Sequence, residues 1–292
     1  MSNQGDQGDQ GDQGDVGIVG TSGSGWTFPD RVDLPFMLER DPKKPKNPIE
    51  AQRIERESFG EGSWDPGWKA WRAVSDFGMT SWRDAIDGER DGDGFPNPKE
   101  VQEIFYPDAQ VESTEKELDT LFTMARDERP DAVGEIVHQR EEFISHFMWL
   151  CGGRRSTHPQ TFLVYSIATL CSSVVTMHYK GHFNRPRPSQ LAPALMPPIE
   201  FPGHASYPSG HSTQAHLFAM CAKETLPDQQ KDSMAPALRA LAARLARNRE
   251  IAGLHYRSDS LAGKWLAPEI FGILRPLQIF GDALNAAKEE WK

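Results

Sequence analysis

Apolar residues recur every three or four positions along most of the chain from about residue 113 onward. This period is typical of amphipathic helices that bury one face. The first such helix is predicted to begin at a capping box, Thr114-x-x-Glu117, and to end before Pro130. No stretch alternates between apolar and polar residues as a half-buried strand would. The pattern therefore predicts an all-α fold.

Glycines and prolines divide the rest of this region into further helices. One is predicted to end at Gly152-Gly153 and carries the apolar residues Ile136, Val137, Phe143, Ile144 and Phe147. The next runs from near Pro159 to about Lys180. Four more are expected near residues 210–224, 236–251, 258–273 and 276–290, with Ser233 and Pro236 as start signals for the second of these. Together they predict a helical bundle.

The N-terminal part has a different composition. Residues 4–15 repeat Gln-Gly-Asp four times, and we expect residues 1–25 to be a disordered low-complexity tail because nothing there can bury a core. Residues 26–112 are expected to form an accessory region of mixed helix and loop, and residues 113–292 the helical catalytic domain. In the accessory region Trp64, Trp68 and Trp71 share one helical face, which predicts core packing or, alternatively, the lining of a substrate entrance.

An acidic loop in the accessory region has the spacing of an EF-hand calcium site, with its ligand positions at Glu89, Asp91, Asp93, Gly94 and Glu100. Glu89 replaces the usual first aspartate, however, and Pro96 and Pro98 stiffen the second half of the loop. We expect a solvated acidic turn, with calcium binding as the alternative.

Charge and composition exclude some partners. The net charge of −10 gives no overall attraction to nucleic acid or to an anionic membrane. The apolar run Thr161–Met177 is short and interrupted by hydroxyl residues, so we expect a buried helix and no membrane span. The N-terminus lacks a signal-peptide pattern, which predicts a cytoplasmic or otherwise soluble protein. The three cysteines are expected to be buried free thiols, and the oligomeric state is left open.

Three short motifs carry candidate chemistry. The first, Lys180-Gly-His-Phe-Asn-Arg-Pro-Arg187-Pro188, places a lysine at a helix end and arginines in the loop beyond. Arginine binds an oxyanion through two parallel N–H groups, while lysine supplies a point charge, so the pair suits a phosphate-like ligand. The alternative is a solvated basic loop.

The second motif, Tyr207-Pro208-Ser209-Gly210-His211, opens a predicted helix. Backbone N–H groups of Ser209 and Gly210 at a helix start would point at an anion, the Ser209 hydroxyl would add a donor, and His211 can act as a general acid. The alternative is a structural helix cap.

The third motif runs from Arg249 to Asp259 and includes His255. His255 and Asp259 are four residues apart, on one face of a helix, and an aspartate bonded to one ring nitrogen leaves the other as a nucleophile or ligand. Gly253 is predicted to break the preceding helix and turn Arg249 back toward the same point. The alternative is a surface ion pair.

In this order and spacing the motifs resemble those of the phosphatidic acid phosphatase type 2 (PAP2) and vanadium haloperoxidase superfamily: Lys-x6-Arg-Pro, Pro-Ser-Gly-His, and Ser-Arg-x5-His-x3-Asp. The resemblance covers roughly residues 113–275, and Asn248 stands where the family usually has serine. It implies a helical bundle of this type in which His255 bonds phosphorus or vanadium, Asp259 orients it and His211 serves the opposite apical oxygen. It also implies an oxyanion cradle made of Lys180, Arg187, Ser209, Gly210 and Arg249.

Two reactions share such a cradle. His204, seven residues before His211, and the stretch 253–259 look like the bromoperoxidase branch, which implies vanadate on His255, peroxide-dependent halide oxidation and a possible halide or substrate pocket at His204. We therefore expect a vanadium-dependent haloperoxidase-like enzyme. The alternative is an acid phosphatase that needs no cofactor and hydrolyses phosphomonoesters through a phosphohistidine at His255.

Overall fold

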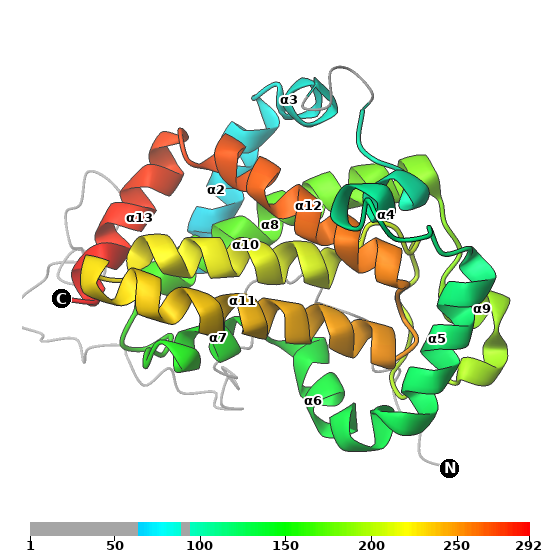
Figure 1. The fold of residues 1–292 in the computed structure, drawn as a ribbon. Helices are drawn as coiled ribbons and strands as arrows, with labels where there is room; N and C mark the ends of the chain where they lie inside the picture. Colours follow the sequence, from blue (N-terminus) through cyan, green and yellow to red (C-terminus); the bar gives the residue numbers. More distant parts are fainter. Residues whose placement is uncertain (1–63, 89–93) are drawn as a thin grey trace, which may run out of the picture. The chain divides into compact units, whose positions relative to one another are not determined.

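The computed structural model describes residues 64–88 and 94–292. The predicted tail at residues 1–25 and the calcium-loop residues 89–93 lie outside this range. Within it the chain forms helices and loops without a strand, so the predicted all-α fold is confirmed (Figure 1). Glu100, the last residue of the expected calcium loop, accepts from the backbone N–H of Asn97 at 2.9 Å and thereby caps a helix.

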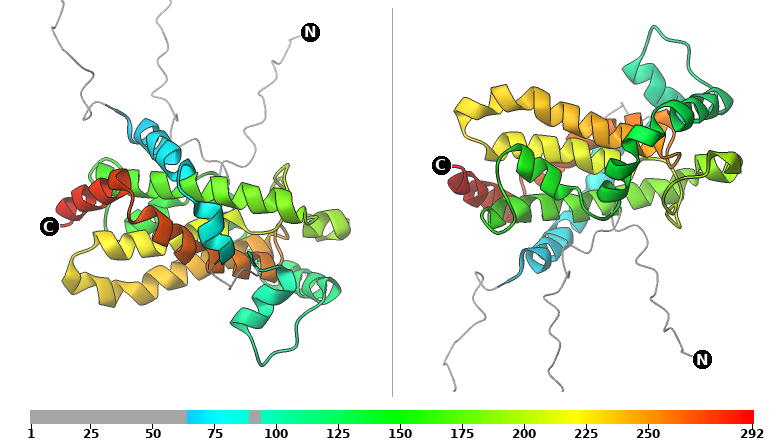
Figure 2. Two further views of the ribbon diagram at one scale, coloured as in Figure 1. Left: turned by 90° about the horizontal axis from the view of Figure 1, so that it is seen from above. Right: turned by 90° about the horizontal axis from the view of Figure 1, so that it is seen from below.

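Four long helices build the centre of the bundle: α8 (Pro159–Phe183), α10 (Gly210–Thr225), α11 (Asp228–Ile251) and α12 (Arg257–Leu274). Helix α10 packs against the other three, and α13 (Gln278–Glu290) packs against α8 and α10. Figure 2 shows α10 and α11 side by side from two further directions. A continuous cluster of buried apolar residues fills the spaces between these helices. All three cysteines are free; Cys171 and Cys221 are buried as predicted, and Cys151 is half-buried.

Helix α8 is apolar on nearly all sides because neighbours surround it. Its 25 residues begin at Pro159, a favoured first residue of a helix, and most of them are buried. Within the part of the chain that the structure describes, the segment Pro159–Leu191 is long and apolar enough to cross a membrane, and 83% of its most apolar window is buried. A core helix shows the same features, so the expected absence of a membrane span stays a prediction.

Helix α2 (Pro66–Gly78) packs on α8 through the face opposite to its tryptophans. Ala70, Ala73 and Phe77 are fully buried, whereas Trp64, Trp68 and Trp71 are 37%, 59% and 43% exposed; the predicted core packing of this stripe is therefore wrong. Small alanines let two helices approach closely, so they form the contact face. Helices α3 (Trp82–Gly88) and α4 (Pro98–Phe105) pack on α12.

Helices α5 (Thr114–Asp127) and α6 (Arg129–Glu141) pack against each other and against α11, followed by α7 (Ile144–Leu150). The predicted cap is wrong by one residue, because the Ser113 hydroxyl accepts from Lys116 N at 3.4 Å. The helix predicted to run to Gly152 is broken at Glu142, whose carboxylate accepts from Ser145 N in the first turn of α7. Helix α11 begins at Asp228, earlier than predicted, with Pro236 inside it.

Candidate active site

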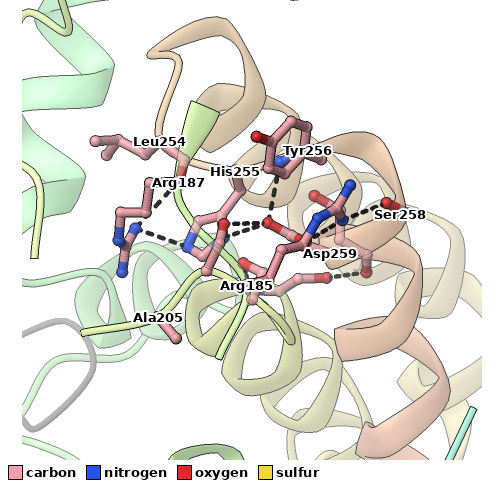
Figure 3. A network of polar contacts seen from close by, with 12 residues as sticks. Arg185, Arg187, Ala205, Leu254, His255, Tyr256, Ser258 and Asp259 are labelled. Atoms are coloured by element: carbon pink, nitrogen blue, oxygen red, sulfur yellow. Dashed lines mark hydrogen bonds and ion pairs between the residues drawn. The ribbon is translucent and has the colours of Figure 1, made fainter. Parts of the chain in front are cut away.

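The three sequence motifs meet where α8 ends and where α10 and α12 begin. Figure 3 shows Arg187 of the first motif beside His255 of the third. The Lys180 ammonium donates to the Ala205 carbonyl at 3.0 Å, which joins the first motif to the loop before the second. The Arg187 guanidinium donates to the Leu254 carbonyl at 3.2 Å and so joins the first motif to the third. Segments separated by up to about 70 positions in the sequence thus surround His255.

His255 has its two ring nitrogens in different environments. Nδ1 lies 3.1 Å from Asp259 Oδ2, and Nε2 lies 3.4 Å from Arg187 Nη1 (Figure 3). Because an ionised carboxylate only accepts hydrogen bonds, the proton of a neutral His255 belongs on Nδ1, and Nε2 carries a lone pair. His255 is therefore arranged as a nucleophile or ligand through Nε2.

The charge states of this pair follow from burial and neighbours. Burial lowers the pKa of His255 to about 3, and the nearby positive charges of Arg187 and Lys180 act in the same direction against the Asp259 hydrogen bond. Burial alone would raise the pKa of Asp259, but the charge of Arg185 and the hydrogen bonds from His255 and Ser206 hold it below its ordinary value. At neutral pH the pair is thus a neutral imidazole and a carboxylate.

Two buried cations stand beside the nucleophile. Lys180 also donates to the Ser206 carbonyl at 3.2 Å, and Arg187 Nε donates to the His204 carbonyl at 3.0 Å. Both side chains are buried. Carbonyl oxygens orient a cation without cancelling its charge, so these bonds hold positive charge close to His255.

Arg249 is buried in the last turn of α11. The chain then turns back, because Gly253 adopts a positive φ of 78° and Leu254 N donates to the Arg249 carbonyl at 3.1 Å. A glycine adopts this backbone conformation without the strain that a side chain would introduce. The predicted helix break at Gly253 is therefore confirmed.

The start of α10 differs in part from expectation. Ser209 N donates to the Asp259 carbonyl at 3.0 Å, so the prediction that this N–H points at an anion is wrong. The Ser209 hydroxyl accepts from Ser212 N at 3.3 Å and caps the helix, and the N–H of Gly210 opens the first turn. Helix α12 approaches this turn closely at Gly263, where a Cβ would lie 2.7 Å from the Ser209 carbonyl.

His211 is buried on the same turn of α10. Its Nε2 lies 3.4 Å from the carbonyl oxygen of Gln139 on α6, and its ring stacks on Phe143 at 5.0 Å between centroids. Gln139 in turn accepts at Oε1 from the Asn248 amide, 3.0 Å away. Asn248, the departure from the family pattern, therefore contacts the residue whose carbonyl faces His211.

His204 lies beside the cations. Its Nδ1 is 3.1 Å from Arg187 Nη2, and its side chain is half-buried. His204 thus contacts Arg187 of the predicted oxyanion cradle, and the halide or substrate pocket at His204 stays a prediction.

Sequence reasoning missed Gln139 and the residues that surround Asp259. Arg185 bonds Asp259 Oδ1 at 2.7 Å, and the Ser206 hydroxyl donates to Asp259 Oδ2. Glu117, expected to cap its own helix, is buried and bonded to Arg185 instead. Arg185 stands two residues before Arg187 in one basic run, which was a usable signal; Glu117 and Gln139 carry none in a single sequence.

No cluster of three or more His, Cys, Asp or Glu side chains suited to a metal ion occurs in residues 64–88 and 94–292. Vanadate needs no such cluster, because it is an oxyanion that a single imidazole can ligate while cations bind its oxygens. Nε2 of His255, with Arg187 and Lys180 nearby, fits this donor set.

Comparison with known proteins places the three motifs within one family segment. Residues 161–276 match the model of the PAP2 superfamily. No curated protein matches the chain. Among solved structures, the chain is similar to the first transmembrane PAP2 type phosphatidylglycerolphosphate phosphatase from Bacillus subtilis, with 16% sequence identity, 71% of this chain and 94% of that chain covered, and a TM-score of 0.32. A TM-score this low says nothing about substrate or membrane location. The haloperoxidase branch gains no support from these matches.

Proposed function

We propose that this chain, which carries a PAP2 superfamily domain at residues 161–276, is a phosphatase that hydrolyses phosphomonoesters through a phosphohistidine at His255. The observation that carries the proposal is the state of His255. Its Nδ1 faces Asp259 and its Nε2 faces the buried Arg187, which is the arrangement that nucleophilic attack on a phosphate requires. Every step needed for hydrolysis can be assigned to residues of this chain.

The first step is attack by the Nε2 lone pair of His255 on phosphorus. The N–P bond forms as the bond from phosphorus to the ester oxygen breaks, and His211 protonates the departing alkoxide. In the second step water attacks phosphorus, His211 takes the proton from that water, and the N–P bond breaks to release inorganic phosphate. Both histidines return to their starting states.

Positive charge around the phosphate would supply much of the rate enhancement. Lys180, Arg187 and Arg249 would hold the non-bridging oxygens, with the Ser209 hydroxyl and the Gly210 N–H as further donors. The three cations are buried, and preorganised charges act more strongly in a low-dielectric site than in water. Asp259 would stabilise the positive charge that develops on the ring of His255.

Vanadium-dependent halide oxidation is the second candidate. Its support is the spacing of His204 and His211 in the sequence, as in the bromoperoxidase branch. His255 would ligate the vanadate and the same cations would bind its oxygens; the bound group would supply the oxidation of halide by peroxide. The phosphatase is preferred because its steps need only residues of this chain, with His255 facing Asp259 and Arg187, whereas halide oxidation also needs bound vanadate.

The test is to assay the purified full-length protein for hydrolysis of 4-nitrophenyl phosphate and for peroxide-dependent bromination, each with and without orthovanadate. A phosphatase hydrolyses the ester without vanadate and is inhibited by it. Quenching with alkaline detergent during turnover of an ester that carries a radiolabelled phosphoryl group should trap label on the protein. This label should be stable to base and lost in acid, as expected for phosphohistidine.

His255→Gln serves as the matched control and should trap no label. Bromination that requires vanadate, together with no ester hydrolysis in its absence, would overturn the phosphatase proposal in favour of the second candidate. Label that persists in His255→Gln would place the phosphoryl group on another residue.

A further inference from the structure

We infer that Arg185 is a positioning residue for His255, acting through Asp259, and that Glu117 of α5 keeps Arg185 in this role. The inference rests on the proposed function, because it assigns what holds the nucleophile in line. It also separates two arginines of one basic run: Arg187 faces His255, whereas Arg185 faces carboxylates.

The Arg185 guanidinium bridges two carboxylates. Its Nη1 donates to Asp259 Oδ1 and to the Ser258 hydroxyl, both at 2.7 Å, and its Nη2 donates to Glu117 Oε2 at 2.8 Å (Figure 3). Its flat face lies 3.8 Å from the centre of the Tyr256 ring. Only 11% of the side chain is exposed. Hydrogen bonds and stacking together leave this guanidinium a single orientation.

This orientation fixes Asp259 from the side away from His255. Asp259 Oδ1 takes the Arg185 bond, while Oδ2 faces His255 Nδ1 and accepts from Tyr256 N at 3.1 Å and from the Ser206 hydroxyl. With both oxygens bound, the carboxylate cannot rotate about its terminal bond. Asp259 sets the orientation and tautomer of His255. Because Arg185 fixes the orientation of Asp259, it acts on His255 indirectly, through the Asp259 carboxylate.

Glu117 holds Arg185 and the start of α12 at the same time. Its carboxylate accepts from Ser258 N at 2.7 Å and from the Ser258 hydroxyl at 2.9 Å, in addition to Arg185. Ser258 is in the first turn of α12, where unpaired backbone N–H groups favour an anion. The carboxylate thus fixes the helix that carries Asp259 and the arginine that orients Asp259.

Glu117 also limits the charge that Arg185 can offer to a substrate. The carboxylates of Glu117 and Asp259 together offset the positive charge of Arg185, so Arg185 does not act as a further cation for the substrate phosphate. Helix α5 lies outside the residues 161–276 that match the family, so this brace comes from a part of the chain beyond the family segment. The expected consequence is a larger role in turnover than in oxyanion binding.

The test compares Arg185→Met and Glu117→Gln with Arg187→Met as the contrasting variant. For Arg185→Met, kcat should fall by about 10- to 100-fold, as for other residues that orient a catalytic ligand. The affinity for orthovanadate should fall less than in Arg187→Met, because the cations that bind its oxygens remain. Arg187→Met should weaken orthovanadate binding. Glu117→Gln keeps the size of the side chain and should lower kcat less than Arg185→Met.

An NMR measurement tests the same inference without requiring enzymatic activity. In protein with ¹⁵N-labelled histidine, the Nδ1–H proton of His255 bonded to Asp259 should give a downfield proton signal, identified by its loss in His255→Gln. Arg185→Met should shift or broaden this signal even if the phosphatase proposal fails. An unchanged signal and kcat in Arg185→Met, or a loss of orthovanadate affinity equal to that of Arg187→Met, would overturn the inference. If Arg185→Met does not fold, the same measurements on Glu117→Gln decide the matter.

Discussion

The two histidines of the site are held in very different ways. His255 sits at the end of a chain of short bonds through Asp259, Arg185 and Glu117, with distances of 2.7 to 3.1 Å. His211 faces the Gln139 carbonyl at 3.4 Å and stacks on Phe143. The nucleophile side is thus clamped by ionic contacts, and the acid side is held by packing and a long hydrogen bond.

This difference matches what each residue would have to do. A nucleophile must present one nitrogen along one line, so a fixed tautomer and orientation favour the reaction. A general acid must lose a proton in one step and regain it in the next, so it has to be compatible with both states. A carbonyl partner accepts from the ring in either role, whereas a carboxylate partner would favour the charged form.

The most damaging change should be His255→Ala. Without the nitrogen that bonds phosphorus, turnover should fall by about 10⁴- to 10⁶-fold, as for other enzymes that lose a nucleophile. Retained orthovanadate should be lost as well. Steady-state assays and equilibrium dialysis with orthovanadate measure the two effects. A smaller loss than that of His211→Ala would reverse the assignment of the two sides.

His211→Ala should be the second largest effect. Loss of a general acid should slow ester cleavage by about 10²- to 10⁴-fold, while orthovanadate still binds because the cations and His255 remain. The deficit should shrink for esters whose leaving groups need no proton. Assays with an alkyl phosphate and a nitrophenyl phosphate measure this, and an equal deficit for both would remove His211 from the acid role.

The cations give a smaller and graded effect. Arg187→Ala should weaken orthovanadate binding by about 10- to 100-fold, since hydrogen bonds to charged groups contribute about 1.5–3 kcal/mol. Lys180→Gln should weaken it less, because glutamine can still donate to the Ala205 carbonyl that the ammonium contacts. Titration of both variants tests the order, and a larger loss in Lys180→Gln would contradict it.

Much of this fold follows from local sequence pattern. The starts of α8 and α10 and the ends of α5 and α11 lie where proline, serine and glycine signals predict them. The exposed face of α2 could not be predicted from the local pattern. Helical periodicity places Trp64, Trp68 and Trp71 on one face, but it does not determine which of the two apolar faces of the helix packs against α8. That choice depends on the neighbouring helix, which a single sequence does not reveal.

The residues of the candidate site also fall into those that the sequence predicts and those that it does not. Residues within each motif are close in sequence, so Lys180, His211 and His255 could be found from spacing alone. Glu117 and Gln139 could not, because each reaches the site through tertiary contacts with residues more than 70 positions away. Glu117 even fitted a local pattern, the capping box, which a buried ion pair with Arg185 overrides.

The pH dependence of stability should reflect the burial of His255. Burial lowers the pKa of His255 from 6.5 to about 3. Between these two pH values the imidazole of His255 is therefore protonated in the unfolded chain and neutral in the folded protein. The contribution of His255 to stability is complete above about pH 6.5 and is lost as the pH falls toward 3. Urea unfolding at pH 7 and pH 5 should therefore show a smaller difference in His255→Gln than in the parent. An equal difference would mean that His255 is protonated in the fold.

The smallest effect is expected from Asn248→Ser, which restores the residue of the family pattern on the acid side. The change removes the 3.0 Å bond from the Asn248 amide to Gln139 Oε1, and one lost hydrogen bond costs about 1 kcal/mol of stability. Gln139 keeps its 2.6 Å bond to Glu135, and its carbonyl stays in α6, so His211 keeps its partner. The melting temperature should fall slightly while kcat changes less than in any variant above. A kcat loss for poor leaving groups as large as that of His211→Ala would show instead that the acid side is as tightly coupled as the nucleophile side.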